Sequence, residues 1–197
     1  MNYIDKIINM YGDRPDIIEA FKNVDRRMFL PGASKQYADY DMPLPIGYGQ
    51  TTSQPSLIAD MIYQIDIKEG DKVLEIGTGT GFASAVMANL DVDLYTVEKI
   101  RQLYEIAKKN LSGYPNVKVF LAEEGVLGLP QYAPFDKIIV FAHADEIPQE
   151  LVDQLSVNGK MIIPVGDDYV QYLYRVTKTI DGDEVEKLYP VRFVPIR

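Results

Sequence analysis

The segment KVLEIGTGTGF, residues 72–82, is the part of the chain whose residue types most directly suggest chemistry. Three glycines alternate there after an apolar run that carries a carboxylate, Glu75. Glycine permits positive φ angles and lets a ligand approach the backbone closely. Such a segment is typical of sites that bind a nicotinamide cofactor, a flavin or S-adenosylmethionine.

The spacing of the glycines distinguishes among these ligands. The dinucleotide fingerprint is G-x-G-x-x-G, whose helix N-terminus holds a pyrophosphate. Gly77, Gly79 and Gly81 are instead spaced G-x-G-x-G, which favours a cofactor without phosphates. S-adenosylmethionine fits, because its methionine part needs close backbone approach and its ammonium and sulfonium favour nearby negative charge. We therefore predict that Gly77, Thr78 and Gly79 contact this methyl donor and that Glu75 binds it directly or through water.

The next two predicted strands also end in acids. Glu98, in YTVEK, ends the second strand, where a carboxylate can bond two ribose hydroxyls, and Lys99 adjoins it in the predicted cofactor site. Glu123, Glu124 and Gly125 follow the third strand, where an adenine amino group would lie. The alternative interpretation is that the glycines only relieve a tight strand-to-helix turn and the acids are solvated loop charges.

The composition excludes several kinds of chemistry. The chain has 197 residues, no cysteine and one histidine, which excludes disulfides, cysteine nucleophiles and multi-histidine metal sites, so we expect no metal. The net charge of −9 argues against a surface that follows nucleic-acid phosphates. No apolar run approaches the roughly 20 residues of a spanning helix, and the N-terminus lacks a signal-peptide core. We expect a cytoplasmic protein, a monomer or weak homo-oligomer, that binds neither nucleic acid nor membrane.

From residue 72 onward, predicted strands alternate with predicted helices. The strands are KVLEIG, DLYTVEK, VKVFLAE, FDKIIVFA and KMIIPVG, and the helices are FASAVMANL, IRQLYEIAKKNL and PQELVDQLS. Near-continuous apolar strands alternating with helices indicate a parallel sheet covered on both faces. VQYLYRVTKT and EVEKLYPVRFVPI follow through short turns, so we expect the last three strands side by side, the final two running antiparallel. The predicted fold is doubly wound α/β, a mostly parallel, seven-stranded, Rossmann-like sheet with antiparallel C-terminal edge strands.

The N-terminal part has a different character. IDKIINMY and PDIIEAFKNV show helical spacing, whereas residues 31–56 are rich in Gly, Pro, Tyr and Ser and predict a long, functional loop. Ser53 or Gln54 is expected to cap the helix that opens at Pro55. We predict one domain, 1–197, whose parts are N-terminal helices and loop (1–56), a cofactor-binding core (57–166) and C-terminal antiparallel strands (167–197).

Several segments together resemble one known family. They are ADYDMPLPIGYGQTTSQP, LEIGTGTGF, APFDKIIVFA, QLSVNGKMIIPVG and FVPI, and they look like protein-L-isoaspartate O-methyltransferases. The match starts at NVDRRMFLPG and keeps the order and similar spacing. Its G-x-G-Q-T-x-S-x-P loop is absent from most methyltransferases of this fold. The resemblance implies methyl transfer from S-adenosylmethionine to the α-carboxylate of L-isoaspartyl residues in damaged proteins, which leaves S-adenosylhomocysteine and an ester that closes to a succinimide.

The resemblance also implies roles for single residues. The serine of the loop, which contacts the reacting carboxylate in the family, corresponds to Ser53. The ribose-binding acid corresponds to Glu98, and the adenine-binding pair corresponds to Glu124 and Gly125. The C-terminal residues that hold the substrate backbone correspond to Phe193, Val194 and Pro195.

The implied reaction needs few catalytic side chains. A carboxylate is ionised at neutral pH, so no general base is required, and the chemistry depends on alignment and exclusion of water. We therefore predict that Thr51 and Ser53 are catalytic and that Thr52 and Ser53 bind the substrate, since hydroxyls position a carboxylate without overstabilising its charge. The alternative is that these hydroxyls form a helix-capping cluster before Pro55.

The chain departs from the family pattern at some positions. Glu123 and Glu124 replace a glycine and an aspartate, and the longer side chain must fold back to reach adenine. Phe141-Ala142-His143-Ala144-Asp145 replaces a run of small residues after the fourth strand of the parallel sheet. We predict that His143 faces the substrate; the alternative is a histidine that points to solvent.

Other functions stay open at this point. One is a methyltransferase of the same fold for another acceptor, although FAHA stands where nucleic-acid amino methyltransferases carry [DN]-P-P-[FYW]. Another is a divergent S-adenosylmethionine-binding protein that lacks turnover. A nicotinamide dehydrogenase is disfavoured by the glycine spacing and by the TTSQP loop.

Overall fold

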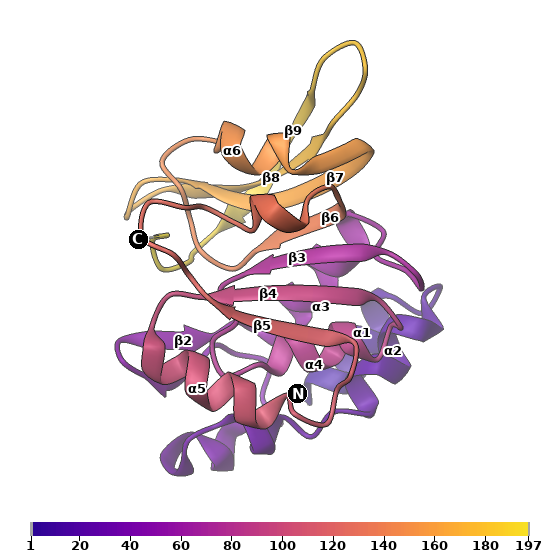
Figure 1. Cartoon of the computed structure of the whole chain (residues 1–197). Helices are drawn as coiled ribbons and strands as arrows, with labels where there is room; N and C mark the ends of the chain where they lie inside the picture. Colours follow the sequence, from indigo (N-terminus) through magenta and orange to yellow (C-terminus); the bar gives the residue numbers. More distant parts are fainter. Residues whose placement is uncertain (1, 197) are drawn as a thin grey trace.

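The computed structural model describes residues 2–196 and has at its centre a sheet with the strand order β5-β4-β3-β6-β7-β8-β9 (Figure 1). The strands are β3 (Lys72–Ile76), β4 (Asp93–Glu98), β5 (Val117–Leu121), β6 (Phe135–Val140), β7 (Leu155–Gly166), β8 (Gln171–Thr177) and β9 (Glu184–Val191). β3 to β7 pair in parallel, whereas β8 pairs antiparallel with both β7 and β9. The seven-stranded, mostly parallel sheet and the sequence order of its last three strands are therefore confirmed.

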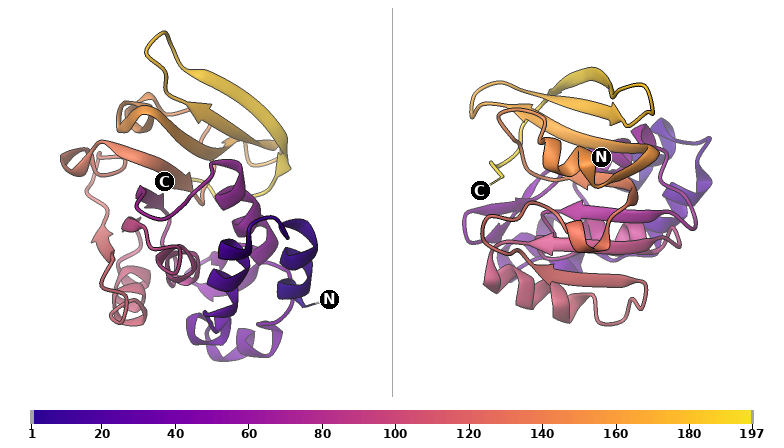
Figure 2. Two further views of the ribbon diagram at one scale, coloured as in Figure 1. Left: turned by 90° about the vertical axis from the view of Figure 1, so that its right-hand side faces the viewer. Right: turned by 45° about the horizontal axis from the view of Figure 1, so that its top comes forward.

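The two faces of the sheet carry separate apolar cores. Successive side chains of β3 alternate between them, so that Val73 packs into one core and Leu74 into the other. The first core includes α1 (Tyr3–Met10), α2 (Pro15–Lys22), α3 (Pro55–Gln64), α4 (Phe82–Ala88) and α5 (Arg101–Asn110). The second includes α6 (Gln149–Asp153) and the residues that flank the 3-10 helix η3 (Pro130–Tyr132). Figure 2 shows the N-terminal helices gathered on one side of the sheet.

The predicted long loop of residues 31–56 is in fact folded. It contains η2 (Gly32–Tyr37), which follows η1 (Arg26–Phe29), and an antiparallel hairpin of β1 (Leu44–Gly47) and β2 (Gln50–Thr52). Positive φ angles of 93°, 56° and 70° at Gly47, Tyr48 and Gly49 make the turn of this hairpin. The sequence did not predict these strands because each is short and because Pro and Gly, which normally mark loops, are frequent in the segment.

The last predicted strand is too long. β9 ends at Val191, beyond which the Gln171 amide bonds the chain through the Phe193 N–H at 2.7 Å and the Phe193 carbonyl at 3.2 Å. The chain then pairs with the segment after β6: the His143 N–H donates to the Val194 carbonyl, and the Ile196 N–H donates to the His143 carbonyl, both at 2.8 Å. Residues 194–196 are thereby carried to the carboxyl ends of the parallel strands.

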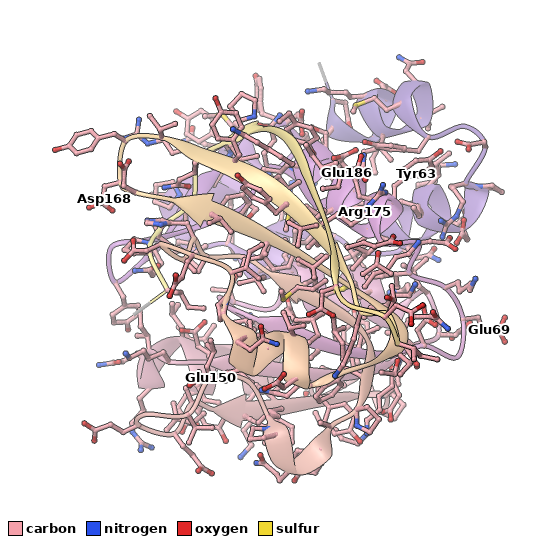
Figure 3. The ribbon with its side chains drawn as sticks, turned by 90° about the horizontal axis from the view of Figure 1, so that it is seen from above. Tyr63, Glu69, Glu150, Asp168, Arg175 and Glu186 are labelled. Carbon is pink, nitrogen blue, oxygen red and sulfur yellow. The ribbon has the colours of Figure 1, made fainter. Side chains whose placement is uncertain are left out.

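The edge strands are anchored to α3. Arg175 of β8 donates to the carbonyl of Gln64, the last residue of α3, at 2.9 Å and forms an ion pair with Glu186 of β9 (Figure 3). The division of the chain at 56 and 166 stays a prediction, and residues 1 and 197 of the predicted domain lie outside the described residues. In the described range, no helix combines the length and apolar character needed to cross a bilayer.

Candidate active site

The glycine segment forms the loop between β3 and α4. Gly77, Gly79 and Gly81 have φ angles of 94°, 57° and 99°. A Cβ on Gly81 would lie 2.9 Å from Cγ of Leu111, so this glycine allows α4 to pack closely, as the alternative interpretation holds. A Cβ on Gly79 would lie 3.1 Å from Cδ1 of Ile46, across the wall of a cavity. Gly79 thus keeps side-chain atoms out of that cavity.

This cavity, which we call the glycine cavity, has a volume of about 570 Å³ and is bordered by the glycine segment and the β1–β2 hairpin. It lies at the carboxyl ends of β3 and β4, the edge at which doubly wound sheets bind ligands. Its lining includes the predicted cofactor-binding residues Gly77, Thr78, Gly79, Glu98 and Lys99. Their close approach has a simple cause: parallel pairing of β3 with β4 brings the ends of both strands to the same edge.

Glu98 joins the two strand ends through its carboxylate. Oε2 accepts from the Gly79 N–H at 2.8 Å, and Oε1 accepts from the Ile100 N–H at 2.9 Å. Burial raises the pKa of Glu98, although these backbone hydrogen bonds oppose the rise. The carboxylate therefore holds the glycine loop and also contributes to the cavity wall.

A second cavity, which we call the C-terminal cavity, has a volume of about 660 Å³ and is bordered by α3, the end of β9 and the residues after it. Phe193 and Val194, predicted to bind the substrate, line this cavity. Thr51, Ser53, Phe141 and Val194 line both cavities. The two cavities therefore adjoin at these residues.

The Ser53 hydroxyl is available at this junction. No residue in the described range hydrogen-bonds it, and it does not cap α3. Asp41 has that function instead: it accepts from the Ser56 N–H at 2.8 Å and from the Gln54 amide at 2.8 Å. Gln54 is the N-cap residue of α3, as one of the two predicted positions, but its side chain makes no capping hydrogen bond, because the Asp41 carboxylate, distant in sequence, accepts from the Ser56 N–H. Ser53 is left free to bind a ligand.

Glu75 is fully buried and does not line either cavity. Its carboxylate accepts from the Ser84 hydroxyl, while Oε1 has no partner among the described residues. Burial raises the pKa of Glu75 to about 7; the hydrogen bond from Ser84 opposes the rise, and the charge of Glu98 adds to it. A direct contact between Glu75 and a cofactor stays a prediction.

His143 does not point to open solvent, because the residue is only 3% exposed. It lines neither cavity, and a contact with the substrate stays a prediction. Nδ1 lies 3.0 Å from the Gly166 carbonyl, and Nε2 lies 3.3 Å from Oδ1 of Asp168 on the β7–β8 turn. The physical reason is that the backbone of His143 pairs with Val194 and Ile196, which directs its side chain towards β7.

Other predicted residues fall into two groups. Thr52 lines the glycine cavity, and Pro195 does so as well. Glu124 and Gly125 are exposed and line neither cavity, so their contact with adenine stays a prediction.

Phe141 and Asp60 are among the cavity residues that were not predicted. Phe141 lines both cavities, and its position directly after β6 was the available signal. Asp60 lines the C-terminal cavity and accepts from the hydroxyls of Tyr11, at 2.6 Å, and Tyr189. Those partners come from the end of α1 and from β9, so no local pattern could reveal them. Within residues 2–196, no cluster of three or more His, Asp or Glu side chains is arranged for a metal ion.

Comparisons with known proteins match nearly the whole chain and not only the glycine segment. The family model for protein-L-isoaspartate(D-aspartate) O-methyltransferase (PCMT) matches residues 3–197. The chain is similar to the protein-L-isoaspartate O-methyltransferase of Thermosipho melanesiensis, at 44% identity over 194 residues that cover 96% of this chain and 98% of that protein. Protein-L-isoaspartate O-methyltransferase 1 of Archaeoglobus fulgidus is 45% identical over 185 residues, which cover 91% of this chain and 84% of that protein.

Solved structures give the same result. A protein-L-isoaspartate O-methyltransferase superposes with a TM-score of 0.90 at 30% identity, covering 99% of this chain and 65% of that one. A Plasmodium falciparum PCMT in complex with S-adenosyl-L-homocysteine superposes with a TM-score of 0.82 at 27% identity, covering 100% of this chain and 99% of that one.

Proposed function

The chain belongs to the protein-L-isoaspartate(D-aspartate) O-methyltransferase family, and we propose that its reaction takes place where the glycine cavity meets the C-terminal cavity. The reaction is transfer of a methyl group from S-adenosylmethionine to the carboxylate of an L-isoaspartyl residue in a damaged protein, which leaves S-adenosylhomocysteine. One observation carries the assignment of the site: Thr51, Ser53, Phe141 and Val194 line both cavities. Two substrates that exchange a group must bind in adjoining sites.

The glycine cavity fits the methyl donor. The wall at Gly79 is bare backbone, which suits the methionine part, and the Glu98 carboxylate can accept hydrogen bonds from the two ribose hydroxyls. Gly77, Thr78 and Lys99 complete this part of the wall. When bound there, S-adenosylmethionine supplies a methyl group already activated by its sulfonium, so the protein needs no metal ion or acid to activate it.

The C-terminal cavity holds the acceptor. Ser53 donates its free hydroxyl proton to one oxygen of the isoaspartyl carboxylate, and Thr51 lies on the same shared wall. Phe193 and Val194 border the peptide backbone. Because the carboxylate is already ionised at neutral pH, these residues orient it and exclude water rather than remove a proton. A neutral hydroxyl also avoids stabilising the ground-state charge more than the transition state.

The residue that most suggested a different acceptor does not enter the site. The imidazole of His143 is buried against Gly166 and lines neither cavity, so it does not narrow the acceptor site. A net charge of −9 likewise favours a protein acceptor over a nucleic acid. We extend the proposal to a cytoplasmic protein, monomeric or weakly homo-oligomeric, which cell fractionation and sedimentation would test.

Two peptides that differ only in one isoaspartyl or aspartyl linkage test the proposed function. Each is incubated with the protein and methyl-labelled S-adenosylmethionine, and base-labile volatile label is counted. Label from the isoaspartyl peptide alone is expected. Label from neither peptide, with S-adenosylhomocysteine still bound, would instead identify the divergent alternative with another acceptor or no turnover.

A further inference from the structure

Arg26, in η1, is a buried cation that lines neither cavity. Arg26 is only 1% exposed, and no carboxylate in the described range forms an ion pair with it. A charge buried without an opposite charge is strongly unfavourable unless hydrogen bonds replace the lost water. The hydrogen-bond acceptors around the guanidinium therefore indicate the structural role of Arg26.

Backbone carbonyls surround the guanidinium. Nη1 donates to the carbonyls of Ala38 and Tyr40, at 3.3 and 2.9 Å, and Nη2 donates to those of Met42 and Ser53, at 2.9 and 3.4 Å. Three of these carbonyls precede the β1–β2 hairpin, and the fourth follows it. One side chain thus joins both ends of the hairpin, and one of its partners is Ser53 itself.

The guanidinium also packs against an aromatic ring. Its central carbon lies 5.5 Å from the ring centre of Phe82, the first residue of α4, which lines the glycine cavity. Burial lowers the pKa of Arg26 to about 10, while Tyr3 and Asp41 oppose this change, so the group is still charged at neutral pH. Arg26 thereby ties the hairpin to the helix that follows the glycine segment.

On the basis of the methyl transfer proposed above, we propose that Arg26 is a positioning residue that holds Ser53 at the junction of the two cavities. The guanidinium is a planar group with several donors in fixed directions, which lets it bind carbonyls from both ends of the hairpin together. A lysine ammonium is a single point and cannot reproduce that pattern. Loss of the pattern shifts the hydroxyl of Ser53, while the glycine segment and Glu98, on the opposite part of the glycine cavity wall, keep their positions.

Arg26→Lys, with Arg27→Lys as its matched control, tests this role. Arg27 is exposed and pairs with Asp39, so it provides the same chemical change at the next position. Arg26→Lys is expected to lower kcat about 10- to 100-fold, since small displacements of positioned groups have effects of this size. The Kd of S-adenosylhomocysteine is expected to stay within about threefold, because the ammonium can still contact Phe82. Arg27→Lys is expected to change neither quantity more than about twofold.

A reporter on the hairpin gives a readout that does not need turnover. The chain contains no tryptophan, so Tyr48→Trp places a single indole at the exposed hairpin turn, outside both cavities. In this background Arg26→Lys is expected to lower the fluorescence anisotropy of the indole, and Arg27→Lys is expected to leave it unchanged. If Arg26→Lys is insoluble, Arg26→Gln, which removes the buried charge, takes its place.

The outcomes separate this proposal from the proposed function. Absence of methyl transfer in the parent protein would refute the function, whereas the anisotropy would still report whether Arg26 orders the hairpin. An unchanged kcat or an unchanged anisotropy in Arg26→Lys would overturn the positioning role. Equal losses of kcat and of S-adenosylhomocysteine affinity would also overturn it, because they would indicate general loss of structure.

Discussion

The two walls of the proposed site are built in different ways. The glycine wall consists of consecutive residues at the end of β3 and one acid at the end of β4, joined by the bond from the Gly79 N–H to Glu98 at 2.8 Å. The hairpin wall depends on side chains far away in sequence, with Arg26 on its carbonyls and Asp41 at its exit into α3. The glycine wall therefore belongs to the rigid centre of the sheet, whereas the hairpin wall, which also borders the glycine cavity, depends on a few long-range polar contacts. Mutations in the two walls should have separable effects.

Ser53→Ala is expected to have the largest effect and to act on turnover alone. Removing one preorganised donor at a reacting group typically lowers kcat about 100-fold. Because the serine bonds no described part of the protein through its hydroxyl, the Kd of S-adenosylhomocysteine should stay within about twofold. Steady-state kinetics and calorimetry measure the two quantities, with the exposed Ser112→Ala as a control. A matched loss of donor affinity would contradict the separation of the walls.

Glu75→Gln tests the buried carboxyl group that precedes the glycine segment. Burial raises the pKa of Glu75 from 4.5 to about 7 in the folded protein, so between these values the folded state binds more protons than the unfolded state. The contribution of this group to stability is therefore full at low pH and is lost as the pH rises through about 7. We expect the parent protein to lose roughly 2 kcal/mol more than Glu75→Gln between about pH 5 and about pH 8.

Urea unfolding at several pH values measures this difference. Comparing the parent protein with Glu75→Gln cancels the titration of the groups that are not coupled to Glu75. Parallel stability profiles for the two proteins would contradict the raised pKa of Glu75.

Glu98→Gln is expected to act on the donor alone. Replacing a charged acceptor of two ribose hydroxyls should weaken S-adenosylhomocysteine about tenfold, or about 1.4 kcal/mol. At saturating donor, kcat should change less than about threefold, since no contact with the acceptor is lost. Glu105→Gln, an exposed acid on α5, is the matched control. A large fall in kcat with unchanged donor affinity would contradict the assignment of Glu98 to the donor site.

Asp41→Asn is expected to have the smallest effect, on stability. Burial raises the pKa of Asp41, but hydrogen bonds from Lys6, Ser56 and Gln54 outweigh burial, and the pKa is lowered. Its contribution is thus present above the unfolded pKa and is lost as the pH falls through the folded pKa. We expect a loss of about 1 kcal/mol at neutral pH, as for other helix caps, that shrinks in acid. Thermal unfolding beside Asp145→Asn measures it, and a loss that grows in acid would contradict the assignment.

The sequence predicts one wall much better than the other for a physical reason. The sheet, the glycine loop and Glu98 follow from local periodicity and from the rule that parallel strands end at one edge. Arg26 could not be recognised, because its partners are backbone carbonyls, which carry no residue signature. The cap of α3 by Asp41 was missed because it crosses a folded hairpin.

The end of the chain shows the same limit. Alternation alone extends the last strand to residue 196, but the amide of Gln171 bonds Phe193 and ends the ladder at Val191. The new course of the chain then pairs with His143 and buries an imidazole that the motif pattern places in the site. Side chains that compete with a strand ladder are decided by tertiary contacts rather than by periodicity.

The most direct measurement is a crystal structure of the protein with both S-adenosylhomocysteine and an isoaspartyl peptide. We expect the sulfur in the glycine cavity, the peptide in the C-terminal cavity, and the isoaspartyl carboxylate within hydrogen-bonding distance of the Ser53 hydroxyl. A carboxylate bound away from the residues that line both cavities, with Ser53 unengaged, would show that transfer does not take place at their junction.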